Sequence, residues 1–189
     1  MKTKKILALL LAAVMLCSFA AACSSDEGEE TGGVKDTVVV AINGEPTKLT
    51  PYLDTSANNT IVEIQMLEPL FRMDNEGNVH PLLAESYEWT GDLELTVKLR
   101  EGVTFSNGNA LTSDDVLYTL EHFRDSGRSA SMVACVDFEN TTCPDDTTIV
   151  IAMNTYDASF MDTMGNYSFG ILDRETCEGF EAAGSWSWL

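Results

Sequence analysis

The side chains that could do chemistry are few in this chain of 189 residues, and their spacing does not form a catalytic pattern. Ser106 and Ser113 precede His122, which could act as a base, but no G-x-S-x-G elbow surrounds either serine. The acidic pairs at 114–115 and 145–146 begin elements, where carboxylates serve as caps or turn residues. No P-loop and no G-x-G-x-x-G motif occurs. The residues therefore predict a protein that is not an enzyme.

The acidic stretch after residue 73 has the spacing of a calcium-binding loop but lacks its glycine. Asp74, Glu76, Asn78 and Glu85 fall at positions one, three, five and twelve of such a loop. Val79 occupies the sixth position, where glycine makes the sharp turn. The stretch therefore predicts a hairpin turn and no metal site.

Cysteine usage indicates no metal centre either. Beyond residue 23 the cysteines are Cys135, Cys143 and Cys177, an odd number. We expect free, mostly buried thiols; the alternative is a disulfide between Cys135 and Cys143, which oxidation outside the cell would permit. Because the chain has no C-x-x-C motif and only two histidines, we expect no Cys/His metal site, and we predict no cofactor.

The first 22 residues have the pattern of a targeting segment. Three lysines precede the apolar run Ile6–Ala20, which is shorter than the ~20 residues of a membrane span. Small residues then lead to Cys23, as at a bacterial lipoprotein cleavage site. We predict a lipoprotein signal peptide over 1–22 and a lipid on Cys23 that anchors the protein to the outer face of the membrane. An ordinary secretory peptide cut near Ala22 and an uncleaved anchor are the alternatives.

The acidic balance of the chain excludes some partners. There are 11 basic and 30 acidic residues, and loss of the three lysines in residues 1–22 would change the net charge from −19 to −22. Such a chain has no basic surface to neutralise phosphates, so nucleic acid is not an expected partner. Residues 23–36 are acidic and almost without apolar side chains, which predicts a flexible linker.

The stretch from Pro81 to Phe123 predicts a strand, tight turns and a capped helix. Leu93–Leu99 alternates apolar with polar or charged side chains, which is typical of a half-buried strand. Residues 106–109, Ser-Asn-Gly-Asn, are typical of a turn. Thr112 predicts a helix N-cap, because acids follow at 114 and 115. The apolar residues behind this cap recur at helical spacing: Val116, Leu120 and Phe123.

The rest of the chain contains further elements of both kinds. We predict strands over 37–43, 71–73 and 147–153, helices over 61–70, 156–164 and 174–183, and an extended stretch over 166–172. The first strand is β-branched and uncharged, so it is predicted to be buried in a sheet. This mixture places the chain in the α/β class, with mixed α+β character.

The central stretch resembles the signature region of the family 5 extracellular solute-binding proteins. These are the oligopeptide- and dipeptide-binding receptors of ABC importers and their relatives. The residues that match the family pattern are, in the approach, Pro81, Leu83, Ala84 and Ser86; in the strand, Leu99, Arg100, Gly102, Val103 and Phe105; and in the turn and cap, Gly108, Leu111, Thr112, Asp115 and Val116. Asn107 stands where the family usually has Asp.

The resemblance implies an incomplete type II periplasmic-binding-protein-like fold. Residues 37–50 would start domain I, residues 51–165 would form most of domain II, and residues 166–189 would begin the return to domain I. Domain III would be absent, so the chain would be the N-terminal portion of a longer receptor. The apolar residues around Val38–Val40 would then lack covering strands, and we expect an exposed apolar edge there.

The resemblance also implies where a ligand would bind. In the family the first strand leads to a loop that enters the ligand cleft, which places Thr55, Ser56, Ala57 and Asn58 against the ligand. Small polar side chains and open backbone suit hydrogen bonding to a peptide main chain. The residues alone favour a surface loop, with residue 59 or 60 capping the next helix.

The resemblance predicts a lipoprotein that captures oligopeptides, dipeptides or a related small solute for import. Its partners would be the ligand and the permease subunits of an ABC transporter. It would be extracytoplasmic and lipid-anchored to the bacterial cell membrane. A surface lipoprotein with a scaffold or partner-binding role, a lipoprotein enzyme and a non-functional fragment are the alternatives.

Overall fold

The computed structural model describes residues 37–46, 49, 56–127, 129–166 and 168–182. The chain divides into two compact units, Met1–Ala41 and Ile42–Leu189. The predicted signal peptide, Cys23 and the predicted linker lie outside the described residues. Within the described part of the chain, no helix is both long enough and apolar enough to cross a membrane.

The described residues of the first unit, 37–41, form neither helix nor strand. Val38, Val39 and Val40 expose 85%, 90% and 69% of their surface. The strand predicted over 37–43 is therefore wrong, whereas the predicted exposure of these apolar residues is confirmed. β-Branched residues favour a strand where neighbouring strands satisfy the backbone and cover the side chains. None of the described strands pairs with this segment.

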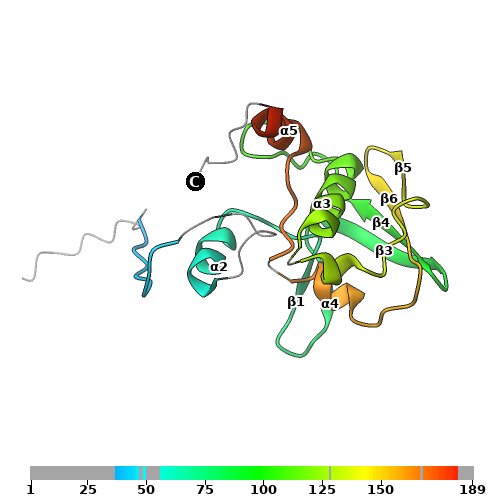
Figure 1. Ribbon diagram of the computed structural model, residues 1–189, viewed down its shortest axis with the longest axis horizontal. Helices are drawn as coiled ribbons and strands as arrows, with labels where there is room; N and C mark the ends of the chain where they lie inside the picture. The colour runs from blue at the N-terminus through cyan, green and yellow to red at the C-terminus, as the bar shows by residue number, and fades with distance from the viewer. Residues whose placement is uncertain (1–36, 47–48, 50–55, 128, 167, 183–189) are drawn as a thin grey trace, which may run out of the picture. The chain divides into compact units, whose positions relative to one another are not determined.

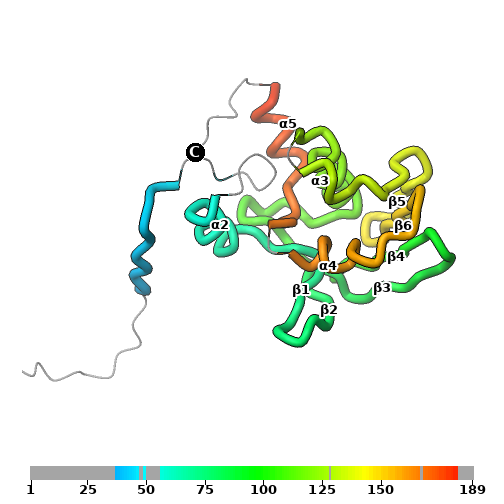
Figure 2. Tube along the Cα trace, turned by 60° about the horizontal axis from the view of Figure 1, so that its bottom comes forward, coloured from blue at the N-terminus to red at the C-terminus, as the bar shows by residue number. Residues whose placement is uncertain are grey.

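The second unit contains a four-stranded antiparallel sheet in the order β3-β4-β6-β5 (Figure 1). Its strands are β3 (Ala84–Gly91), β4 (Glu94–Leu99), β5 (Thr142–Asp145) and β6 (Thr148–Ala152). A separate hairpin consists of β1 (Phe71–Met73) and β2 (Val79–Pro81), and Figure 2 shows it projecting from the larger sheet. The predicted strand over 71–73 is confirmed, and the residues that follow it form the turn of this hairpin, as predicted.

Alternation along β4 determines which face of the sheet is buried. Leu95, Val97 and Leu99 are fully buried, and the first two lie opposite Ile151 and Ile149 on β6. Burying a side chain of this size stabilises the fold by about 1.5–3 kcal/mol. The strands predicted over 93–99 and 147–153 are confirmed, with ends shifted by one residue.

Strand β3 was not predicted from the sequence. It lies at the edge of the sheet, paired with β4, and four successive residues from Glu85 to Glu88 are exposed. A strand whose residues are mostly exposed gives only a weak hydrophobic period. Its place is determined by backbone pairing with the strongly periodic β4.

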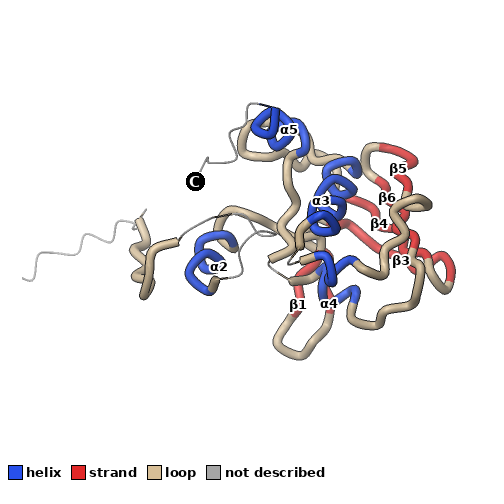
Figure 3. Tube along the Cα trace, viewed as in Figure 1, coloured by secondary structure: helices blue, strands red, loops and turns tan. Residues whose placement is uncertain are grey.

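Helix α3 (Ser113–Asp125) contacts β5 and β6, and Figure 3 shows it against the strands of the sheet. Val116, Leu120 and Phe123 are fully buried, as the helical spacing predicts. The amide of Thr112 donates to Asp115 Oδ2 at 2.8 Å, which is the contact that the third residue of the helix makes in a capping box, and the hydroxyl of Thr112 donates to the same oxygen at 2.8 Å. The predicted N-cap and the predicted helix are therefore confirmed.

The remaining helices are short. They are α2 (Ala57–Glu63), a 3-10 helix (Ala130–Val133), α4 (Phe160–Met164) and α5 (Arg174–Ala182). Helix α5 confirms the helix predicted from residue 174, and α4 covers the second half of the helix predicted over 156–164. The described residues within 166–172 form neither helix nor strand.

Helix α2 is shifted toward the N-terminus from the helix predicted over 61–70. It begins after Ser56, which caps it, and it ends six residues before Pro69. Proline cannot occupy a helix interior, because it lacks an amide hydrogen and clashes with the preceding turn. Ile61 and Ile64 are 38% and 41% exposed, whereas Leu70, which follows the helix, is fully buried.

Candidate functional site beside helix α2

The predicted ligand-binding residues lie at the start of helix α2, except Thr55, which is outside the described residues. Ser56 is the N-cap, and its Oγ accepts a hydrogen bond from the amide of Asn59 at 3.3 Å. Ala57 is exposed and Asn58 half-buried in the first turn. The structure therefore makes Ser56, Ala57 and Asn58 neighbours, and it gives Ser56 the capping role expected for residue 59 or 60.

Helix α2 also carries two buried polar side chains that the sequence analysis missed. Asn59 is fully buried, and Glu63 is 2% exposed. The two residues are four apart, so they share one face of the helix. Their spacing was visible in the sequence, but Asn and Glu on a short helix usually face water. Burying such side chains is costly unless they make polar contacts.

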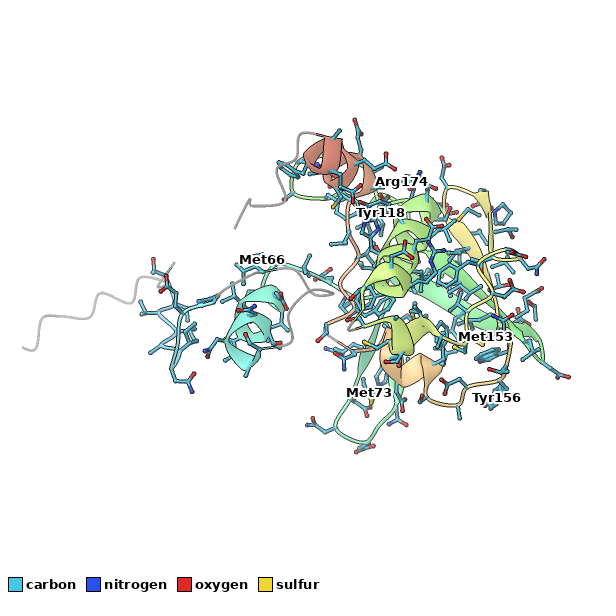
Figure 4. All side chains as sticks on the ribbon, in the orientation of Figure 1. Met66, Met73, Tyr118, Met153, Tyr156 and Arg174 are labelled. Atoms are coloured by element: carbon cyan, nitrogen blue, oxygen red, sulfur yellow. The ribbon has the colours of Figure 1, made fainter. Side chains whose placement is uncertain are left out.

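A groove of about 350 Å³ follows the C-terminal end of α2. It is lined by residues 64–68 and 103–106, together with Leu83, Leu111 and Ile171. Figure 4 labels Met66, a lining residue that is half exposed. Residues 56–58 do not line the groove, because they lie at the opposite end of α2. The predicted site residues and the groove are therefore separate features of one helix.

The 103–111 segment gives the groove one of its sides. The amide of Phe105 donates to the carbonyl of Asn109 at 2.8 Å, and the amide of Leu111 donates to the carbonyl of Val103 at 3.0 Å. Gly108 lies between them with φ of +96°, a conformation that side-chain-bearing residues rarely adopt. The turn predicted over 106–109 is confirmed, and it holds Phe105 and Leu111 at the groove.

A second backbone contact brings the segment before α5 to the same groove. The amide of Ile171 donates to the carbonyl of Glu68 at 3.0 Å. A Cβ atom at Gly170 would collide with the side chain of Leu67. Glycine at this position therefore lets the segment before α5 pass close to the residues that follow α2.

The turn that shapes the groove is bound to the start of α5 by one carboxylate. Asp173 Oδ2 accepts hydrogen bonds from Asn107 Nδ2 at 2.5 Å, Asn109 Nδ2 at 3.0 Å and Thr176 Oγ1 at 2.6 Å. Burial raises the pKa of Asp173, but these hydrogen bonds outweigh it and hold the pKa below its usual value. Asn107 is the departure from the family pattern, and an aspartate there could not donate to Asp173.

Ser113 and His122, two of the groups that could have been catalytic, are engaged in structural contacts. Ser113 Oγ donates to the carbonyl of Asp145 at 2.6 Å. The ring of His122 bonds through Nδ1 to the carbonyl of Tyr118 and through Nε2 to the carboxylate of Glu181, each at 3.0 Å. In the described part of the chain, no group of three or more His, Cys, Asp or Glu side chains could hold a metal ion.

The three cysteines of the second unit are free, as expected. Cys135 and Cys177 are buried and Cys143 is half-buried. Burial raises the pKa of all three thiols, that of Cys177 to about 11. The thiolate is the nucleophile and the metal ligand, so these thiols are unreactive near neutral pH.

The sequence of this chain matches one family pattern and the sequences of known binding proteins. The pattern of the family described as bacterial extracellular solute-binding proteins, family 5 Middle, matches residues 78–186. The oligopeptide-binding protein AppA of Bacillus subtilis (strain 168) is 33% identical over 129 residues, which cover 63% of this chain and 24% of AppA. The glutathione-binding protein GsiB of Escherichia coli (strain K12) is 28% identical over 148 residues, which cover 76% of this chain and 28% of GsiB.

Solved structures show the same relationship. The structure of AppA in complex with a nonapeptide matches with a TM-score of 0.63 and 27% identity, over 71% of this chain and 27% of that chain. The periplasmic binding protein AgaA from A. tumefaciens R10, in complex with agropinic acid, matches with a TM-score of 0.66 and 25% identity, over 73% of this chain and 28% of that chain. This chain therefore spans about a quarter of the length of these relatives.

These matches confirm the predicted mixed α/β fold of the periplasmic-binding-protein kind. The relatives are binding proteins and not enzymes, in agreement with the prediction from the residues. The family pattern covers more than half of the chain, including α3, both outer strands of the sheet and α5. This protein therefore belongs to the family 5 bacterial extracellular solute-binding proteins.

Proposed function

We propose that this chain forms part of a receptor that captures peptides outside the membrane and delivers them to the permease subunits of an ABC importer. The observation that supports this most directly is the similarity to AppA, which is named as an oligopeptide-binding protein and has been solved with a nonapeptide. GsiB is named as a glutathione-binding protein, and AgaA has been solved with agropinic acid, so glutathione and agropinic acid are the competing ligands.

In this proposal the two features of α2 have different tasks. Thr55, Ser56, Ala57 and Asn58 face the peptide main chain, for which short polar side chains and accessible backbone are suited. The groove after α2 takes an apolar side chain of the peptide. Its volume of about 350 Å³ lies in the range of ligand pockets, and Leu83, Leu111 and Ile171 give it an apolar lining.

The proposal also assigns the parts of the chain around this site. Residues 1–22 act as a lipoprotein signal peptide, Cys23 carries the lipid, and residues 23–36 form the linker. Residues 37–50 start domain I, residues 51–165 form most of domain II, and residues 166–189 begin the return to domain I. The receptor is extracytoplasmic, and the lipid holds it on the bacterial cell membrane.

Thermal unfolding of the whole chain in the presence of a nonapeptide mixture tests the proposal, with glutathione and agropinic acid in parallel. A ligand at 100 times its Kd stabilises the native state by about 2.7 kcal/mol. For a chain of this size we expect the unfolding temperature to rise by roughly 5–10 °C. No rise with the peptides, in a sample whose circular dichroism shows a folded chain, would overturn the peptide assignment.

Two methionine variants locate the binding. Met66→Ala removes a half-exposed side chain from the groove, and we expect it to reduce the peptide-dependent rise. Met73→Ala is the matched control, because Met73 is also partly exposed but lies on β1, outside the groove lining (Figure 4). An equal effect of the two variants would contradict the assignment of the groove.

A further inference from the structure

A second groove, of about 450 Å³, lies at the tip of the β3–β4 hairpin. Its lining residues are Trp89, Gly91, Asp92, Leu93 and Tyr156. It shares no lining residue with the groove beside α2. Figure 4 labels Tyr156 at the end of the second unit that is opposite to Met66. The hairpin groove is therefore a separate surface feature.

The hairpin groove lies where the buried face of the sheet becomes exposed to solvent. Trp89 lies opposite Leu95 across the β3–β4 pair, and Leu93 precedes Leu95 by two residues. Leu95 is fully buried, whereas Leu93 is 39% exposed and Tyr156 is 67% exposed. The rings of Trp89 and Tyr156 stand 6.1 Å apart with an interplanar angle of 53°. Two large aromatic side chains are thus held together at a position where one of them faces solvent.

The backbone holds this arrangement in place. The amide of Met153 donates to the carbonyl of Leu93 at 2.9 Å, and the amide of Asn154 donates to the carbonyl of Cys135 at 2.8 Å. These bonds attach the chain before Tyr156 to the hairpin and to the segment after the 3-10 helix. The exposed ring of Tyr156 therefore projects from a supported loop.

The charges around the hairpin groove are negative. Asp92 lines it, and none of its five lining residues carries a positive charge. Asp157 follows Tyr156 directly, and hydrogen bonds from the hydroxyl and amide of Ser159 lower the pKa of its carboxyl. An aromatic face beside a carboxylate is complementary to a cation with a flat apolar surface.

We propose that the hairpin groove binds an arginine-bearing segment of a partner protein, with the guanidinium stacked on Tyr156 and paired with Asp92. Arginine fits better than lysine, because its planar group both stacks on an aromatic ring and forms directed hydrogen bonds with a carboxylate. The net charge of −19 attracts basic partners as a whole, and the groove gives such a partner a specific contact. Its distance from the groove beside α2 leaves both surfaces free to be occupied together.

Fluorescence of Trp89 gives a direct measurement of this binding. The full chain is made with Trp186→Phe and Trp188→Phe, which leaves Trp89 as its one tryptophan. It is titrated with three blocked pentapeptides of sequence Gly-X-Gly-X-Gly, where X is arginine, lysine or citrulline. Citrulline has the shape of arginine without its charge. We expect saturable binding with an affinity order of arginine, lysine and citrulline, and weaker binding as salt rises. Equal binding of the citrulline and arginine peptides would overturn the proposal.

Four variants test the residues in the same background. Tyr156→Ala and Asp92→Asn should each weaken arginine-peptide binding roughly two- to fivefold, since an exposed cation–π or ionic contact has this magnitude. Tyr156→Phe keeps the ring and should bind as before. Glu85→Gln removes one exposed charge from strand β3, away from the groove lining, and should have little effect. Equal losses in Asp92→Asn and Glu85→Gln would show attraction by net charge alone and would reject the site.

One more variant separates this site from the proposed peptide-capture site. Met66→Ala alters the groove beside α2 and should leave the Trp89 titration unchanged. If Met66→Ala weakens the arginine signal while Tyr156→Ala does not, the peptide occupies the groove beside α2 and the hairpin site is rejected. The two proposals can therefore fail independently.

Discussion

Asn109 and Asp173 are 64 residues apart in the chain, and the side-chain amide of the first donates to Oδ2 of the second at 3.0 Å. Asn107 makes a parallel bond to the same oxygen at 2.5 Å. The two bonds attach the turn beside the α2 groove to the residue that precedes α5. The shape of the groove thus depends on a contact between distant parts of the family segment.

Asp173→Asn should destabilise the chain by about 1 kcal/mol at neutral pH, because the amide cannot accept these bonds as strongly as a carboxylate. The native pKa of Asp173 is lowered, so its contribution is complete above the unfolded pKa of about 3.9 and is lost as pH falls through the lower native pKa. Urea unfolding from about pH 7 to pH 3 should show the difference between wild type and variant closing at the acidic end.

The control for this measurement is Glu139→Gln, which removes an exposed carboxylate from a loop elsewhere in the second unit. It should show a smaller effect at neutral pH. A difference between wild type and Asp173→Asn that stays constant across the titration would show that the Asp173 carboxylate does not provide the stabilisation.

Phe123→Ala should destabilise the second unit by about 3–5 kcal/mol, because it empties a fully buried ring position in the core. Phe123 also lies against Phe169, with ring centroids 4.2 Å apart, so the cavity would extend to the segment before α5.

Val39→Ala is the matched test of the first unit. Val39 is 90% exposed, and its substitution should change the unfolding free energy by no more than about 0.5 kcal/mol. Chemical denaturation measures both, and a large loss in Val39→Ala would mean that this segment is covered in solution.

Gly108→Ala should destabilise the turn by about 1–2 kcal/mol, because φ at this position is +96°. It should also reduce the peptide-dependent thermal rise, since the turn holds Phe105 and Leu111 at the groove. Gly179→Ala is the opposing variant. Gly179 lies inside α5, and a Cβ atom added there would meet open space, so alanine should stabilise the helix by about 0.5–1 kcal/mol. Thermal unfolding of both variants tests the pair, and equal signs would contradict the backbone argument.

Cys23→Ser should abolish incorporation of a labelled fatty acid into the full chain expressed in bacteria. A serine cannot form the thioether or carry the acyl group in a lipoprotein of the predicted kind, so the label and the membrane association should be lost together. Cys17→Ser lies within the predicted signal peptide and is the control, which should keep the label. Labelling of the Cys23→Ser chain would reject Cys23 as the anchor.

The sequence by itself determined the elements whose signals are local. The alternation of Leu95, Val97 and Leu99 predicted β4, and Thr112 with Asp115 predicted the start of α3, because strand period and helix capping involve neighbours in the chain. The family was also recognisable from the same stretch, since its turn and cap residues stand in sequence order.

Only the tertiary structure decided the features that depend on distant partners. Strand β3 is mostly exposed, has only a weak hydrophobic period and is paired with β4. Val38–Val40 has strong strand propensity but no described partner strand, so it forms no strand. The burial of Asn59 and Glu63 was not evident from the sequence, and the bonds from Asn107 and Asn109 to Asp173 join segments that sequence spacing cannot relate. Strand period and helix capping depend on residues that are neighbours in the chain, so the sequence shows them. Burial and long-range hydrogen bonds depend on residues that only the folded structure brings together.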